Sequence, residues 1–201
     1  MEAALRAPLC DGLEFDVRIS ADGVPVLLHD ESLARVQKIP AKCVTLTAAE
    51  LAVHGIPTLG QVLAVTDCEF FLDIELKERV DGAIDLLELE RGRNDDGPTL
   101  RNAAISSFDP SILRWLSDQR PTWPRWLNVY DLSPTTVALA TGLGCAAISA
   151  EWHSIDAPGV ARARQAGLEV AAWTVRDLDD YRALESLGIS AMCVEAAALD
   201  G

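Results

Sequence analysis

The chain alternates short β-rich runs with longer stretches of helical periodicity, and this alternation is the feature that most constrains its fold. The expected strands cover residues 12–19, 24–28, 69–76, 101–108, 125–130, 145–150, 168–175 and 189–194. Residues 81–91 and 177–187 carry apolar side chains at spacings of three and four, which is typical of amphipathic helices. Strands that alternate with helices predict parallel strands joined by crossover helices.

Local signals mark where several of these elements begin and end. Asp109 and Ser133 each stand directly before a proline, a pair that opens a helix. Gly167 and Gly188 stand where a helix would end before the next strand. The segment 20–24 joins two β-rich runs too closely for a crossover, so it predicts a local hairpin.

Apart from the hairpin arm, the chain contains seven strand–helix units in 201 residues. A (β/α)8 barrel usually needs about 250 residues, and about 200 at the low end. We therefore predict an α/β fold, a (β/α)8 TIM-type barrel that lacks its first strand, with a short β-hairpin after the first visible strand. Residues 1–201 would form a single domain.

Charge limits the partners that such a chain could bind. Asp and Glu number 31 and Lys and Arg 17, which gives a net charge of −14 at pH 7. A negative field of this size repels phosphate-rich surfaces, so it argues against nucleic acid or an anionic membrane as the main partner. It suits the binding of cations.

The cysteines and the apolar segments indicate a cytoplasmic protein. The five cysteines form no CxxC pair, have mostly apolar neighbours, and predict small buried side chains in a reducing compartment instead of a zinc site. The first residues lack the basic and apolar regions of a signal peptide. Residues 135–150, the most apolar window, are too few to span a bilayer, so we expect no transmembrane segment.

Glu14-Phe15-Asp16 is the first of three features that could carry chemistry. Residues two apart in a strand project from the same face, so both carboxylates point one way and Phe15 the other. Two carboxylates held together favour a hard divalent cation bound through oxygen. A pair of surface acids without a ligand is the alternative.

His29 and Lys77 belong to the other two features. His29 ends the apolar run 26–28, where a histidine can act as a general acid or base, although a neighbouring carbonyl could simply satisfy it. In residues 72–77, the alternation places Asp73, Glu75 and Lys77 on one face of a strand. Charges buried there need a ligand or a mutual ion pair, and a lysine suits a phosphate oxygen.

The order of these features resembles the glycerophosphodiester phosphodiesterase family. That family's pattern has E-x-D, a DG turn, V-P-V-x-x-H-D, I-P-T-L and I-E-x-K, and this chain carries each of these motifs in that order between residues 14 and 77. Residues 173–175, Trp-Thr-Val, are similar to the family's late strand, and Gly188 to the glycine before its last strand. The resemblance is tight over 12–77 and loose over 82–169.

The resemblance implies a phosphoric diester hydrolase of lipid metabolism that cleaves glycerophosphodiesters to an alcohol and glycerol phosphate. Glu14, Asp16 and Glu75 would hold one divalent cation, Mg²⁺ or Ca²⁺. His29 would be one of two catalytic histidines. Lys77 would contact the phosphate and Trp173 would line the substrate pocket.

The chain departs from the family at both ends. It contains no His-Arg-Gly, the tripeptide that ends the family's first strand and supplies a catalytic histidine and a phosphate-binding arginine. Residues 1–10 match only the tail of the helix that should follow, and Val194-Glu195 replaces a closing Thr-Asp. We therefore expect a shortened or a degenerate family member, with open strand edges that favour self-association.

Several alternatives stay open at this point. His153 follows the run 145–150 and could replace the missing histidine, whereas His54 and Ser107 are better explained as loop or capping residues. The chain could bind metal or a phosphodiester without turnover. It could also be a sugar-phosphate enzyme that uses Lys77 as a Schiff-base amine. The alcohol part of the substrate is not encoded in any readable motif.

Overall fold

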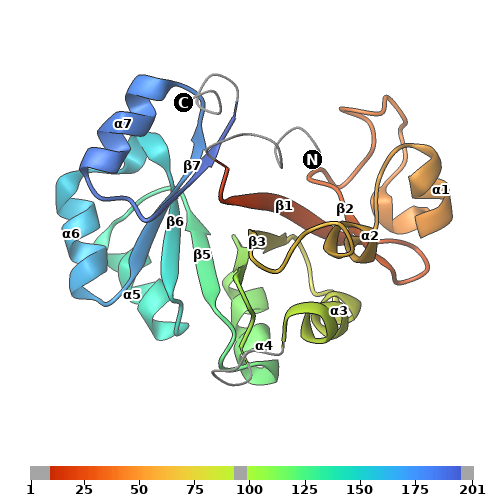
Figure 1. Ribbon diagram of the computed structural model, residues 1–201, viewed down its shortest axis with the longest axis horizontal. Coiled ribbons are helices and arrows are strands. Elements are labelled where there is room, and N and C mark those ends of the chain that lie inside the picture. Colours follow the sequence, from red (N-terminus) through yellow and green to blue (C-terminus); the bar gives the residue numbers. More distant parts are fainter. Residues whose placement is uncertain (1–9, 93–98, 196–201) are drawn as a thin grey trace. The chain divides into compact units, whose positions relative to one another are not determined.

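The computed structural model describes residues 10–92 and 99–195 (Figure 1). The predicted hairpin arm and all seven further strands are present, with helices between them. The chain divides into two compact units, a first unit of Glu14–Ile105 and a second unit of Met1–Leu13 with Ser106–Gly201. Met1–Leu9 of the expected N-terminal helix tail lie outside the described residues.

The first unit carries the predicted hairpin. β1 (Gly12–Ile19) pairs antiparallel with β2 (Pro25–Leu27), with Val17 opposite Leu27. Gly23 has a φ of +79°, a backbone conformation that glycine adopts without steric cost, so the turn can be this tight. The strand order in this unit is β2-β1-β3-β4, and its other elements are η2 (Cys43–Thr45), α1 (Ala48–Val53), α2 (Leu59–Leu63), β3 (Phe71–Leu76), α3 (Asp81–Arg91) and β4 (Ala103–Ser107).

β3 separates apolar from charged side chains. Leu72, Ile74 and Leu76 are fully buried, and the charged residues Asp73 and Glu75 alternate with them along the strand. Burial of each such leucine or isoleucine contributes about 1.5–3 kcal/mol, which fixes the register of the strand. Packing of the apolar face of β3 therefore fixes the direction in which its charged side chains point.

Parallel strands form the centre of the second unit. β5 (Arg125–Val129), β6 (Ala147–Glu151), β7 (Glu169–Val175) and β8 (Ala191–Val194) pair in this order, each parallel to the next. α5 (Pro134–Gly142) packs against β5 and β6, and α6 (Ala157–Gln165) packs against β7. With α7 (Leu178–Ser186), these helices cover one face of the strands (Figure 1). The unit also contains α4 (Pro110–Gln119) and η3 (Trp152–Ser154).

The predicted helix boundaries are confirmed at four positions. The Asp109 carboxylate accepts a hydrogen bond from the backbone N–H of Ser111, and the Ser133 hydroxyl accepts one from Thr136, so both cap the helices they precede. Gly167 and Gly188 follow α6 and α7 with φ values of +79° and +76°. The left-handed conformation ends each helix and turns the chain into the next strand.

Four strands, β3, β4, β6 and β8, begin two residues later than the sequence predicts. Before β3, the carboxylate of Asp67 accepts a hydrogen bond from the N–H of Glu69 at 2.9 Å and holds that segment in a turn. Before β4, Asn102 has a φ of +45°, which is incompatible with a strand. Before β6, the N–H of Cys145 still bonds the Ala140 carbonyl of the preceding helix at 3.1 Å.

The five cysteines form no disulfide. Cys43 and Cys145 are buried, as the sequence predicts, but the prediction of burial is wrong for Cys10, Cys68 and Cys193, which are partly exposed. Within residues 10–92 and 99–195, no helix combines the length and the apolar character that crossing a membrane requires.

Candidate active site

The first unit brings three carboxylates together. Glu14 and Asp16 project from one face of β1, while Phe15 between them is buried with 8% of its surface exposed. Glu75 projects from β3, the neighbour of β1 in the sheet. Each of Glu14, Asp16 and Glu75 offers one oxygen, and these oxygens all lie within 4.8 Å of one another. This cluster is composed of the three residues that the sequence predicts as metal ligands.

Lys77 lies against the same cluster. Its ammonium Nζ is 2.8 Å from a carboxylate oxygen of Asp16, and it also donates a hydrogen bond to Glu75. The backbone N–H of Lys77 donates to the carbonyl of Val17 at 3.2 Å, which anchors the end of β3 beside β1. Lys77 therefore forms the ion pair that the sequence predicts for the buried charges of this strand.

Burial and repulsion raise the pKa of two of these carboxyl groups, Glu14 and Glu75. Although Glu14 as a whole residue is exposed, desolvation of its carboxyl group, followed by repulsion from the neighbouring carboxylates, raises its pKa to about 9. Desolvation also raises the pKa of Glu75, and the hydrogen bond from Lys77 opposes that shift. Together these shifts show a cluster with more negative charge than one ammonium group offsets.

This donor set fits a hard divalent cation. Three carboxylate oxygens from two adjacent strands are the ligand type that Mg²⁺ and Ca²⁺ prefer. A cation there would relieve the repulsion that raises the pKa of Glu14. The residues present therefore fit the metal that the resemblance implies.

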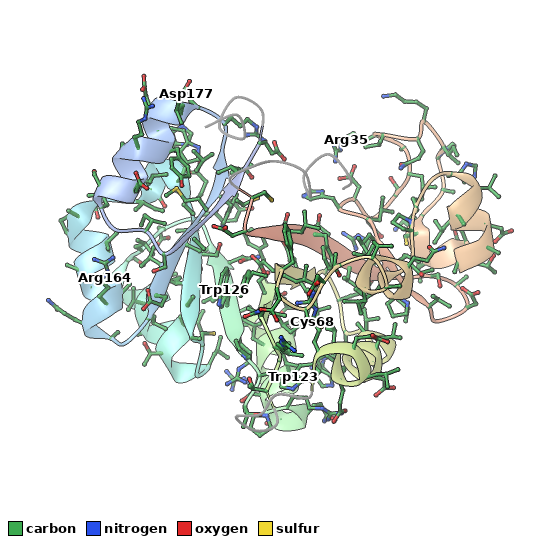
Figure 2. The ribbon with its side chains drawn as sticks, viewed as in Figure 1. Arg35, Cys68, Trp123, Trp126, Arg164 and Asp177 are labelled. Atoms are coloured by element: carbon green, nitrogen blue, oxygen red, sulfur yellow. The ribbon has the colours of Figure 1, made fainter. Side chains whose placement is uncertain are left out.

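His29 follows β2 and is oriented by a carboxylate. Its ring Nδ1 lies 2.7 Å from Asp30 Oδ1, and Arg35 donates to both oxygens of Asp30, at 2.6 Å from Nε and 3.0 Å from Nη2. Figure 2 shows Arg35 in the loop beyond β2. The hydrogen bonds from Arg35, and next from His29, hold the pKa of Asp30 well below its usual range. Asp30 is therefore ionised and can accept a hydrogen bond from Nδ1–H of His29.

The backbone of His29 is held as well. Arg18 of β1 donates to the His29 carbonyl from Nε at 3.1 Å and from Nη2 at 3.0 Å. The N–H of Leu28 donates to the carbonyl of Asp16 at 3.0 Å. Through these two contacts, the backbone around His29 is tied to β1, the strand that carries Glu14 and Asp16.

The remaining sequence candidates lie apart from this cluster in the chain. His54 caps the end of α1 and is exposed, and the Ser107 hydroxyl accepts a hydrogen bond from the N–H of Asp109 at 3.2 Å, consistent with the capping interpretation. In the second unit, His153 Nδ1 lies 2.6 Å from Glu151, and its ring stacks on Trp152 at 3.6 Å. Trp173 of β7 donates from its indole nitrogen to the Ser149 carbonyl at 2.9 Å.

Sequence reasoning missed three residues of the first unit that support His29. Asp30 was visible in the His-Asp pair but was given no role, and nothing in the sequence connected Arg18 or Arg35 with it. The spacing of five between Asp30 and Arg35 carries no signal unless the loop conformation is known. The adjacency of an acid to a histidine was the one usable clue.

Almost the whole chain matches a family profile. Residues 1–199 match the profile described as the glycerophosphoryl diester phosphodiesterase family. The chain belongs to this family. The resemblance that the sequence motifs carry is thereby confirmed, and the family consists of phosphoric diester hydrolases.

Solved structures of glycerophosphoryl diester phosphodiesterases share the fold. A phosphodiesterase from Oleispira antarctica, solved in complex with the product sn-glycerol-3-phosphate, is 24% identical with a TM-score of 0.82, over 96% of this chain and 83% of that one. A glycerophosphodiester phosphodiesterase from Thermotoga maritima is 23% identical with a TM-score of 0.78, over 98% and 86% of the two chains. These likenesses show a mostly parallel, TIM-barrel-like α/β fold. A comparison with curated protein sequences found no significant match.

Proposed function

We propose that this chain hydrolyses glycerophosphodiesters to an alcohol and glycerol phosphate, with one divalent cation, Mg²⁺ or Ca²⁺, held by Glu14, Asp16 and Glu75. The observation that carries the proposal is the convergence of these three carboxylates within 4.8 Å in a member of this family. When bound, such a cation neutralises the charge of the diester and lowers the pKa of an attacking hydroxyl.

Lys77 and His29 supply the groups that act on the diester. The ammonium of Lys77 binds a phosphate oxygen as a point charge. The carboxylates around it keep it in its protonated, charged form. Desolvation disfavours the charged form of Lys77, but hydrogen bonds to Asp16 and Glu75 outweigh it and raise the pKa. A raised pKa opposes a Schiff-base role, because that chemistry needs the neutral amine.

His29 moves a proton at Nε2. With Nδ1–H directed at the ionised Asp30, the lone pair of the neutral ring is on Nε2, where it accepts a proton from the attacking hydroxyl. The same nitrogen then returns the proton to an oxygen of the leaving alcohol. Arg18 donates two hydrogen bonds to the His29 carbonyl and so fixes the backbone of His29. The imidazole then moves only by rotation about its side-chain bonds.

We also propose that turnover by this chain is impaired. Its three histidines are His29, His54 and His153, and none belongs to a His-Arg-Gly tripeptide. Loss of one acid or base costs roughly 10²–10⁴-fold in rate. The same observation favours the second candidate function, a relative that binds metal or phosphodiester without turnover.

Several finer expectations accompany the proposal. We propose that Trp173 contacts the substrate. We also propose that residues 1–201 form one barrel domain without its first strand. The open strand edges of such a barrel promote self-association, which light scattering measures. We also propose a reducing, cytoplasmic compartment, because the five cysteines form no disulfide.

Phosphorus NMR of glycerophosphocholine incubated with the purified chain tests the function. The proposal predicts slow release of glycerol phosphate with Mg²⁺ or Ca²⁺, none with EDTA, and none from Glu75→Gln. Asp85→Asn, an exposed acid on α3, is the matched control and should retain the wild-type rate. Metal binding without any product supports the second candidate and contradicts the first.

A further inference from the structure

The strands of the second unit carry small polar side chains, which we call the polar row: Ser106 of β4, Asn128 of β5 and Ser149 of β6. Asn128 is the direct partner of Ser149 in the register of β5 and β6, which lie side by side (Figure 1). Leu127 and Val129, the neighbours of Asn128 along β5, belong to the apolar core of this unit, so Asn128 points to the opposite side of the strand. The polar row is therefore separate from that core.

The side chain of Ser106 lies on the same face of the strands as Asn128. Ser106 stands two residues before Phe108, so it projects from the same side of the chain as the Phe108 ring. Asn128 stands in the same relation to Tyr130. The Phe108 and Tyr130 rings are in contact, with centroids 5.4 Å apart. Because β4 and β5 are neighbours in the sheet, Ser106 and Asn128 face the same side of two adjacent strands.

Two atoms of the polar row are buried and lack a protein partner. Only 0% of the Ser106 surface and 7% of the Asn128 surface are exposed. Within the described residues, neither the hydroxyl Oγ of Ser106 nor the amide Oδ1 of Asn128 has a hydrogen-bond partner. Buried polar groups of this kind are unfavourable unless they bond to protein or to ordered water. Neighbouring strands are about 4.8 Å apart, so one small molecule between the two side chains can bond to both.

We propose that Ser106 and Asn128 bind a buried water molecule that joins β4 to β5. An amide oxygen only accepts hydrogen bonds, so the bound molecule must be a donor, and the Ser106 hydroxyl can either donate to it or accept from it. Water meets both requirements and is small enough for a site closed to solvent. Ca²⁺ takes about six to eight oxygen ligands, whereas the polar row offers three side-chain oxygens and no charge.

The bound water holds β4 beside β5 just before the aromatic residues that follow these strands. The backbone of the polar row bonds to a third ring, because the Ser149 carbonyl accepts the indole N–H of Trp173 at 2.9 Å. The inference does not depend on the proposed hydrolysis, since the site is closed to solvent and its tests measure structure and stability instead of turnover.

A crystal structure of the purified chain at high resolution tests the proposal directly. We expect one water peak about 2.7–3.2 Å from both Asn128 Oδ1 and Ser106 Oγ. The peak should disappear in Asn128→Leu, which replaces the amide by an apolar side chain of similar size. It should remain in the control Ser107→Ala, because the Ser107 hydroxyl bonds to the N–H of Asp109. Absence of the peak from the wild type, or its persistence in Asn128→Leu, would overturn the proposal.

Urea unfolding tests the same site in solution through the sign of the change. With water bound, Asn128→Leu removes one of its partners and should lower the urea midpoint by about 0.5 M. In a Ser106→Ala background the same substitution should cost no more than about half of that, because no hydroxyl is then left unpaired. A higher midpoint for Asn128→Leu would mean that the amide oxygen has no partner. Equal losses in the two backgrounds would mean that the residues share no ligand, and either result would contradict the proposal.

Discussion

The imidazole Nδ1 of His29 lies 2.7 Å from a carboxylate oxygen of Asp30, and Arg35 holds both oxygens of that carboxylate. This arrangement selects the ring tautomer whose Nε2 is free to accept a proton. A histidine that is 65% exposed would otherwise sample both tautomers and many ring orientations.

Asp30→Asn should therefore lower the rate of diester hydrolysis by roughly 100-fold, since the amide no longer fixes Nδ1–H. The pH–rate profile should also shift, which a merely structural role would not cause. Glu31→Gln, a substitution of the next residue, which pairs with Lys42, is the control. Equal rates for Asp30→Asn and wild type would show that Asp30 does not orient His29 for hydrolysis.

The histidine–carboxylate pairs of His29 and His153 can be separated by mutation. His29→Ala should reduce turnover by roughly 10²–10⁴-fold. His153→Ala should change it less than about threefold, because His153 is 68% exposed and already pairs with Glu151. A loss in His153→Ala as large as that in His29→Ala would instead identify it as the stand-in acid or base.

Stability without metal should fall as the pH rises. Because the pKa of Glu14 is about 9 in the folded chain and near 4.5 when unfolded, the folded state holds an extra proton between those values. The free energy of unfolding in EDTA should therefore decrease from pH 5 to pH 9. Glu14→Gln should flatten this dependence and raise the Tm at pH 8 by a few degrees. Urea unfolding across this range checks it, and a slope unchanged by Glu14→Gln would contradict it.

Lys77 should stabilise the fold when no metal is present. Its side chain is 14% exposed and that of Glu75 is 8% exposed, so Lys77→Met leaves carboxylates with little solvent and no counter-charge. The loss of unfolding free energy should be about 3 kcal/mol. Added Mg²⁺ or Ca²⁺ should recover part of that loss in urea unfolding experiments. The account fails here if Lys77→Met is as stable as wild type in EDTA.

Strand periodicity made the carboxylates and Lys77 predictable. Residues two apart share a face, so Glu14 with Asp16, and Glu75 with Lys77, could be paired from their spacing alone. The alternation of strands and helices likewise predicted every strand, with bounds that differ from the observed ones by at most two residues, as at Ala103, where the left-handed Asn102 delays the strand.

Loop conformation and contacts between separate strands were not predictable in this way. Arg35 reaches Asp30 only because the loop after β2 folds back, and no residue spacing encodes that turn. The rings of Phe108, Tyr130 and Trp173 contact one another, although Phe108 follows β4, Tyr130 follows β5 and Trp173 lies within β7. Their contact depends on the order of strands in space, which a single sequence does not specify.

Calorimetric titration of metal-free protein with Ca²⁺ and with Mg²⁺ tests the central claim most directly. The account predicts one site per chain, proton release on binding at pH 7, and a loss of affinity of at least about tenfold in Glu75→Gln but not in Asp85→Asn. Absence of binding, or equal affinity in wild type and Glu75→Gln, would contradict the assignment of Glu14, Asp16 and Glu75 as the metal site.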